Sequence, residues 1–455
     1  MNKTDFGKGN ITLIILRQAI PLIIAQLASL LYNIVDRIFI GHIPDIGKSS
    51  LTGLGICFPV ITLISAFTLL FGMGGTPLFS IARGSKNEGE ARDIMTHSFV
   101  LLLGSSVIIT ALCYIVMRPL LYGLGASDIT YGYAHQYLMI YLIGTPILMT
   151  GSGMNYYISA QGRPATAMIT TLAGAVINTA LDPIFIFVLG LGIKGAAIAT
   201  IISQLVSLIW VMLFFVRGKS EIPLTLKGFR FKFSTARKIA SVGITNFIME
   251  GTNCAIQVIC NKSLSYYGGD DYVTVMTVIN SVRSILGLIV TGITSGSQPV
   301  LGFNYGAGRY DRVRKAIKTN TLMGVIYTTA AWALVWFFPG FFIRIFTDDA
   351  NILAIGIKYL QIYFMGYMFM SLQFSGQSTF MALAKVRYAI TFSILRKIII
   401  VVPLTLILPL VLTDSISGIF WAEPVSNLLG GSASFLTMYF TVYRRLARKE
   451  SSAKT

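Results

Sequence analysis

The chain has 455 residues, of which 54% are hydrophobic and only 12% are charged, and its formal net charge is +18. A composition this apolar excludes an ordinary soluble domain. The positive charge suggests nucleic-acid binding, but the basic residues concentrate in alternate connections between apolar stretches, which is the positive-inside pattern of a membrane protein. We therefore expect a multi-pass protein of the cell membrane, with both termini in the cytoplasm and no nucleic-acid partner.

Twelve apolar stretches are long enough to cross a bilayer as helices, which predicts an all-α integral membrane protein. They lie near residues 11–40, 51–82, 94–117, 131–160, 165–190, 195–216, 238–266, 272–304, 316–338, 352–381, 387–411 and 416–443.

Two parts of the chain repeat each other. Residues 74–92 resemble residues 295–314, and Pro77 falls on Pro299 at an offset of 222 residues. Each half then holds six spans, so both halves cross the membrane in the same sense and are related by a pseudo-two-fold axis along its normal. We expect a six-helix bundle over 1–216, a basic cytoplasmic connection over 217–238, and a second six-helix bundle with a basic tail over 239–455.

The first span carries an acid in an apolar background. Tyr32 and Asp36 are four residues apart and share one helix face, whereas Arg37 points about 100° away. An acid at the centre of a membrane helix costs roughly 2.5 to 3.5 kcal/mol, so a functional role is expected. In the fourth span Tyr137 and Asn155 lie on either side of a proline, and core packing is an equal alternative for Tyr137.

The fifth and sixth spans contain the stretch INTALDPIFIFVLGLGIKGAAIAT, residues 177–200. Asn178 and Asp182 share a helix face, and Pro183 frees a backbone carbonyl. At about 1.5 Å rise per residue, Asp36, Asp182 and Thr200 all lie roughly 9–12 Å below the outer boundary. These oxygens predict either a ligand set for Na⁺ or two acids that share a proton, while a purely structural acid paired with a neighbouring helix is the alternative.

The second half has different intramembrane acids. Glu250 lies in the seventh span and Glu423 in the twelfth, directly before Pro424 and at the position that matches Thr200. Our hypothesis is that both acids attract cationic substrates. In the alternative, Arg283 pairs with Glu250 and Glu423 caps a helix interrupted at Pro424. The clear intramembrane charges are mostly acids, which argues against a transporter of pyrophosphate-linked lipids.

Three motifs resemble the MATE (multidrug and toxic compound extrusion) family, and its MepA-like bacterial branch most. They are YNIVDRIFIG at 32–41, the loop with Arg83 and Gly84, and INTALDPIFI followed by GIKGAAIAT at 177–186 and 192–200. The resemblance implies two bundles around a V-shaped central cavity, and a monomer that exports lipophilic organic cations by antiport against Na⁺ or H⁺, with alternating access. It implies no enzyme activity and no cofactor. A lipid-linked oligosaccharide flippase of the same superfamily is the alternative.

The resemblance also assigns roles to residues. It implies that the coupling ion binds at Asp36, Asn178, Asp182 and Thr200, and that Pro21 is a hinge in the first helix. Candidates for substrate binding are Tyr32, Tyr137, Asn155, Glu250 and Glu423. Family members with an acid on the seventh helix also have one on the tenth, which this chain lacks, so a second cation site in the C-terminal half is not expected.

Overall fold

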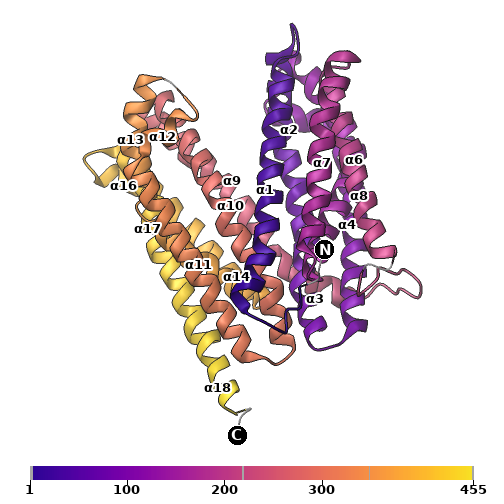
Figure 1. Ribbon diagram of the computed structural model, residues 1–455. Coiled ribbons are helices and arrows are strands. Elements are labelled where there is room, and N and C mark those ends of the chain that lie inside the picture. Colours follow the sequence, from indigo (N-terminus) through magenta and orange to yellow (C-terminus); the bar gives the residue numbers. More distant parts are fainter. Residues whose placement is uncertain (1–3, 218–219, 348, 453–455) are drawn as a thin grey trace. The chain divides into compact units, whose positions relative to one another are not determined.

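The computed structural model describes residues 4–217, 220–347 and 349–452, apart from the side chains of Cys254 and Ser452. The expected connection over 217–238 includes residues 218 and 219, which lie outside the described part, as do the first three and last three residues. Every regular element within the described ranges is a helix (Figure 1). The expectation of an all-helical protein is confirmed.

The helices follow the twelve expected spans in order. In the first half they are α1 (Ile11–Gly41), α2 (Gly47–Thr68) with η1 (Leu69–Met73) and α3 (Gly74–Gly84), α4 (Glu88–Ile115), the short α5 (Met117–Gly123), α6 (Asp128–Ala160), α7 (Pro164–Pro183) with η2 (Ile184–Val188), and α8 (Ile193–Val216). In the second half they are α9 (Phe233–Gly268), α10 (Asp270–Gly306), α11 (Tyr310–Phe337), the short α12 (Pro339–Arg344), α13 (Ala350–Phe364) with α14 (Tyr367–Ala382), α15 (Val386–Ile394) with η3 (Leu395–Val401) and α16 (Val402–Val411), and α17 (Ser415–Met438) with η4 (Tyr439–Tyr443) and α18 (Arg444–Ser452). The η elements are π-helical turns.

Length and composition make most of these helices able to cross a bilayer. Among the described residues, eight helical segments are long and apolar enough, and the pair α13 and α14, bent by 44°, adds a ninth if it forms one span. The remaining three, α9, α11 and α17, have more polar sequences; α11, for example, begins with Asp311, Arg312 and Arg314 within its first five residues. Large apolar side chains such as Ile108, Val188 and Leu410 are 60%, 78% and 74% exposed, which suits a surface that faces lipid.

Local sequence signals explain where several helices begin. The side chain of Asn87 accepts a hydrogen bond from the Glu90 amide at the start of α4, and Ser127 accepts one from Thr130 at the start of α6. Asp414 does the same with Ser417 at the start of α17. Each cap satisfies a backbone N–H that the first helical turn leaves without a partner.

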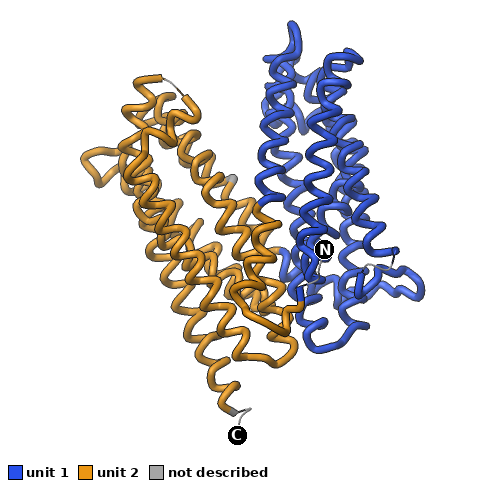
Figure 2. Tube along the Cα trace, viewed as in Figure 1, with its two compact units in different colours: residues 1–4, 24–243 blue, residues 5–23, 244–455 orange. Residues whose placement is uncertain are grey.

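The chain forms two compact units (Figure 2). Unit 1 comprises residues 1–4 and 24–243, and unit 2 comprises residues 5–23 and 244–455. This division differs from the expected domain boundaries at residues 5–23, which the sequence pattern placed in the N-terminal bundle.

Packing against α10 explains why the start of α1 belongs to unit 2. A Cβ atom on Gly296 would lie 2.8 Å from the Ala19 nitrogen, and one on Gly292 would clash with Ile23. Glycine at both positions therefore lets the two backbones approach closely. Further along, the buried side chains of Ile15 and Val300 belong to one hydrophobic cluster, which continues into α11 and α14.

Candidate functional sites

Three of the four expected ion ligands meet between α7 and α8 in unit 1. The Asn178 Nδ2 atom donates to Asp182 Oδ1 at 3.3 Å and to Thr200 Oγ1 at 3.5 Å. Thr200 in turn donates to the Ala196 carbonyl at 3.0 Å. All three side chains are buried, and Asp182 has no exposed surface. The spacing of four residues between Asn178 and Asp182 thus produces the shared face that the sequence predicted.

The end of α7 brings these groups together. α7 ends at Pro183, and the chain continues as the π-helical turn η2. Gly195 lets α8 pack directly on this turn, because a Cβ atom there would lie 2.6 Å from the backbone carbon of Phe185. Proline and π-helical turns both leave backbone groups out of the regular helical pattern and often occur at functional sites.

The fourth expected ligand is Asp36 on α1, which lies in the same electrostatic environment. Its carboxyl group interacts electrostatically with that of Asp182, and the Tyr32 and Tyr137 hydroxyls interact with it as well. Tyr137 is buried and stacks on Tyr141 with ring centroids 5.8 Å apart, so it also belongs to the core of unit 1.

Neither acid is held in an ion pair by the part of the chain that the structure describes, although Arg37 interacts electrostatically with Asp36. Within the described ranges Asp36 and Asp182 form no ion pair, and the Arg37 guanidinium lies over the Phe58 ring, 5.3 Å from its centroid. Three buried oxygens in this cluster also lack any hydrogen-bond partner: Asp36 Oδ1, Asn178 Oδ1 and Asp182 Oδ2. Burying a lone carboxylate is very costly, so this arrangement suits a bound cation or a bound proton.

Asn155 lies in a different place from the acids. Its Nδ2 atom donates to the Ala167 carbonyl at 3.1 Å and to Thr171 Oγ1 at 3.3 Å, and its Oδ1 atom accepts from Thr170 at 3.1 Å. These bonds tie α6 to α7 about two helical turns, roughly 10 Å, from Asn178. These hydrogen bonds brace α6 against α7, and the expected substrate role of Asn155 stays a prediction.

Glu423 on α17 lies beside two basic side chains. Its Oε1 atom lies 2.8 Å from Arg396 Nη2 and 3.4 Å from Lys397 Nζ, and the side chain is 6% exposed. A carboxylate already shared by two cations is poorly placed to attract a cationic substrate. The alternative of a cap on an interrupted helix is wrong, because α17 runs without a break through Pro424.

Glu250 and Pro21 are the remaining residues that the sequence singled out. Glu250 lies on α9 in unit 2, and its carboxyl group interacts electrostatically with Arg283 on α10, although the two form no ion pair among the described residues. Pro21 lies within α1, two residues before the boundary between the two units at residues 23 and 24.

Sequence reasoning missed Arg396 and Lys397. They are adjacent in LRKIIIV, inside the apolar segment Val386–Val411, which is long enough to span a membrane. Two neighbouring basic residues in such a stretch are as costly as the acids that were singled out, and this signal would have found them.

Comparison with known proteins supports the fold and the family. The MatE family matches residues 21–184 and 247–407. The multidrug export protein MepA of Staphylococcus saprophyticus is 24% identical over 437 residues, which is 95% of each chain. The solved structure described as MATE in the bent conformation has a TM-score of 0.92 at 22% identity and covers all of both chains. The outward-facing conformation of a multidrug resistance MATE family transporter of the MOP superfamily has a TM-score of 0.91 at 21% identity, over 99% of this chain and 100% of that one.

The expected resemblance to the MATE family and to MepA is therefore confirmed. The family match extends over both halves of the chain and includes Pro21, Asp36, Asn178 and Asp182. The chain belongs to the MatE family and is a membrane-embedded transporter, not an enzyme.

Proposed function

We propose that this protein exports small organic compounds across the cell membrane by antiport, with H⁺ or Na⁺ entering in exchange. The observation that carries the proposal is the pair of buried acids, Asp36 and Asp182, which have unpartnered oxygens and no ion pair among the described residues. The names of the curated relatives, which are multidrug export proteins, support the class of substrate.

The chemistry of the cluster accommodates either ion. For Na⁺, the carboxylate oxygens of Asp36 and Asp182, together with Asn178 Oδ1, supply the hard ligands that such a cation prefers. For H⁺, one of two interacting carboxyl groups holds the proton, because both cannot be ionised cheaply at close range. In both cases the ion neutralises charge that the apolar surroundings disfavour, so its release and rebinding alter the stability of this region.

Several finer features belong to the same proposal. The two expected bundles, 1–216 and 239–455, move to give alternating access, and Pro21 is the hinge in α1; the sequence repeat and the proline position support this. The protein functions as a monomer in the cell membrane, with both termini in the cytoplasm, and the charge distribution of the loops supports that orientation. Lipophilic cations remain a substrate class, although Glu423 no longer supports them.

Transport in everted membrane vesicles tests the coupling. A dye substrate is added, and a pH gradient and a Na⁺ gradient are imposed separately. We expect accumulation with at least one gradient in the wild-type protein. Asp36→Asn and Asp182→Asn should lose this gradient dependence while inserting at wild-type levels, because an amide neither releases a proton nor binds a cation with comparable strength.

Asp45→Asn is the matched control. Asp45 is exposed in the loop after α1 and has a φ of 61°, a backbone conformation that asparagine tolerates well. This variant removes the same charge without touching the buried cluster and should transport normally. Gradient-driven transport that persists in both Asp36→Asn and Asp182→Asn would rule out the coupling role of the acids.

The flippase alternative gains one argument. The sequence pattern of mostly acidic intramembrane charges argues against a flippase, whereas unit 2 also contains the buried Arg396 beside Lys397. Efflux remains the better proposal because the curated relatives are export proteins of matching length. Energised accumulation of a small soluble dye by purified, reconstituted protein separates the two, since a dedicated lipid flippase would not produce it.

A further inference from the structure

Unit 2 contains a pocket with an unusual charge. Its volume is about 260 Å³, and it is lined by residues of α9, α10, α14, α15 and η3. Three of the lining residues are basic, namely Arg283, Arg396 and Lys397, and none is acidic. They come from helices that cross the membrane, where charged residues are costly and usually functional.

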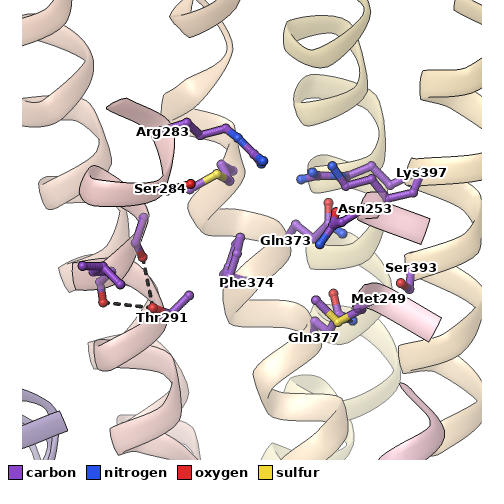
Figure 3. A pocket seen from close by; sticks show the side chains of 14 residues that line it. Met249, Asn253, Arg283, Ser284, Thr291, Gln373, Phe374, Gln377, Ser393 and Lys397 are labelled. Atoms are coloured by element: carbon purple, nitrogen blue, oxygen red, sulfur yellow. Dashed lines mark hydrogen bonds between the residues drawn. The ribbon is translucent and has the colours of Figure 1, made fainter. Parts of the chain in front are cut away.

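Two of the cations face each other across the pocket. Figure 3 shows the Arg283 side chain reaching from α10 and the Lys397 side chain reaching from η3, with their nitrogen atoms directed toward one another. Arg283 forms no ion pair among the described residues, and its Nε atom is buried without a hydrogen-bond partner. Like charges that converge on one space repel each other unless an anion lies between them.

A socket on α17 holds Arg396, the third cation, in place. Glu423, Ser426, Asn427 and Gly430 follow the spacing of one helix face, and this face packs on η3. Arg396 donates to Glu423 at 2.8 Å and to Asn427 Oδ1 at 2.9 Å, and its backbone carbonyl accepts from Ser426 at 3.2 Å.

Gly430 and the π-helical turn complete this socket. A Cβ atom on Gly430 would lie 2.8 Å from Arg396 Cγ, so only glycine leaves room for the arginine stem. A π-helical turn is wider than an α-helical turn, so the side chains of consecutive residues on η3 point in more similar directions. Arg396 and Lys397 therefore both reach the same oxygen of Glu423. The basic residues are therefore positioned by the fold.

The acids nearby do not balance this charge. Arg396 and Lys397 share the single carboxylate of Glu423, and the Lys397 contact is long at 3.4 Å. Glu250 interacts electrostatically with Arg283 but does not line the pocket. Arg396 also keeps a buried Nε atom without a partner, so positive charge and hydrogen-bond donors both remain available.

The rest of the lining suits an organic molecule. Leu288, Met370 and Phe374 supply apolar and aromatic surface, and Gln373 is 5% exposed with an Oε1 atom that has no hydrogen-bond partner. An amide beside an apolar wall can orient a ligand whose charged group is held by arginine and lysine.

From this arrangement we infer that unit 2 contains a binding site for the oxyanion of an organic anion. The carboxylate or phosphate group lies between Arg283 and Lys397, and the apolar part of the ligand contacts Phe374 and Met370. Two kinds of ligand contain such an oxyanion: a soluble organic anion and the head group of an anionic lipid. The inference concerns binding alone, so it stands or falls independently of ion-coupled export.

Equilibrium dialysis with purified, full-length protein in an uncharged detergent tests the site. The probes are naphthalene-2-carboxylate and naphthalene-2-carboxamide, which have nearly the same shape and differ in charge. We expect the carboxylate to bind wild-type protein at least tenfold more tightly than the carboxamide. Arg283→Gln and Lys397→Met should each weaken carboxylate binding about tenfold and leave carboxamide binding unchanged, because each removes one charge-assisted hydrogen bond.

Lys262→Met is the matched control. Lys262 is exposed on α9 in the same unit and does not line the pocket, so this variant should bind both probes as the wild-type protein does. Gel filtration verifies that each variant is folded, and two independent substitutions keep the test valid if one of them is not. Equal affinity for the two probes in wild-type protein, or unchanged carboxylate binding in both pocket variants, would overturn the inference.

A competition arm distinguishes the two sources. Phosphatidylglycerol and phosphatidylcholine are added separately to wild-type protein with bound carboxylate. Displacement by phosphatidylglycerol alone identifies a lipid head group as a ligand of this oxyanion site. If neither lipid displaces the carboxylate, the site takes a soluble organic anion.

Discussion

The two units place different residues at matching positions of the same helix pair. At an offset of 223 residues, Thr200 matches Glu423, and Gly174 matches Lys397. In unit 1 the small Gly174 lies against Ser207, where a Cβ atom would be 2.5 Å from the Ser207 hydroxyl. In unit 2 the large and small residues are exchanged between the two helices: η3 carries the large basic residues, and α17 carries Gly430.

The two units also differ in the charge of their buried side chains. In the described ranges, unit 1 buries Asp36 and Asp182 without an ion pair, and the buried acid of unit 2, Glu423, lies beside two bases. The comparison shows that matching helix pairs in the two halves carry buried side chains of different charge and size. In the two proposals above, a bound cation or proton neutralises the acids of unit 1, and a bound anion neutralises the bases of unit 2. The following predictions test this contrast.

The largest expected effect is on the stability of unit 2. Among the described residues, Glu423 is the one acid in an ion pair with Arg396 and Lys397, so Glu423→Gln leaves buried positive charge uncompensated. Loss of one partner of a buried pair costs about 3 to 5 kcal/mol, so the melting temperature in detergent should fall sharply. The double variant Glu423→Gln with Arg396→Met should recover part of the loss, and failure to recover any would argue against charge as the cause.

Gly430→Ala should have the next largest effect. The added methyl group meets the Arg396 side chain, whose position is fixed by Glu423 and Asn427. Overpacking of this kind costs roughly 1 to 3 kcal/mol, and it should lower the melting temperature. Gly251→Ala on α9 is the control, because a Cβ atom there meets nothing within 4 Å; an equal loss in both variants would contradict the socket.

Asn155→Ala should destabilise unit 1 by about 1 kcal/mol. It removes the hydrogen bonds that tie α6 to α7 at Ala167, Thr170 and Thr171. Because this brace lies about two turns from Asn178, gradient-dependent transport should persist in vesicles. A selective loss of coupling, with unchanged melting temperature, would instead place Asn155 in the ion or substrate path.

The smallest expected effect concerns Asp414, in the loop between α16 and α17. Burial acts to raise the pKa of Asp414, but hydrogen bonds from Lys358 and Ser417 outweigh it and hold the pKa below its ordinary range. The stabilisation is therefore present above about pH 4 and is lost as the pH falls further. Asp414→Asn keeps the helix cap but loses the exposed Lys358 pair, so it should cost only a few tenths of a kcal/mol.

A pH series of melting temperatures checks this. The wild-type protein and Asp414→Asn should differ slightly at pH 7 and converge as the pH falls below about 4. A difference that grows on acidification would have the wrong sign.

Much of the fold could be predicted because the apolar pattern is strong. The twelve expected spans coincide with helical segments, and Asp36 and Asp182 stood out against their apolar surroundings. Asn178 and Thr200 followed from helical spacing and from depth, both of which are local properties of the chain. The Asn178–Asp182 hydrogen bond within α7 and the Asn178–Thr200 hydrogen bond from α7 to α8 agree with that reasoning.

The remainder depended on contacts between distant residues. Arg396 and Glu423 are 27 residues apart, and their ion pair requires the packing of η3 on α17, which no local pattern reveals. The assignment of residues 5–23 to unit 2 rests on the close approach of α1 to Gly292 and Gly296, about 270 residues away in the chain. The basic pair at 396 and 397 was visible in the sequence, but the apolar average of its span concealed it.

One measurement tests the division of charge between the units most directly. It is the affinity for naphthalene-2-carboxylate, compared between Asp182→Asn and Arg283→Gln. Asp182 belongs to unit 1 and Arg283 to unit 2, so the two substitutions should act independently. The account predicts wild-type affinity in Asp182→Asn and about tenfold weaker binding in Arg283→Gln. Equal weakening in both variants, or weakening in Asp182→Asn alone, would contradict it.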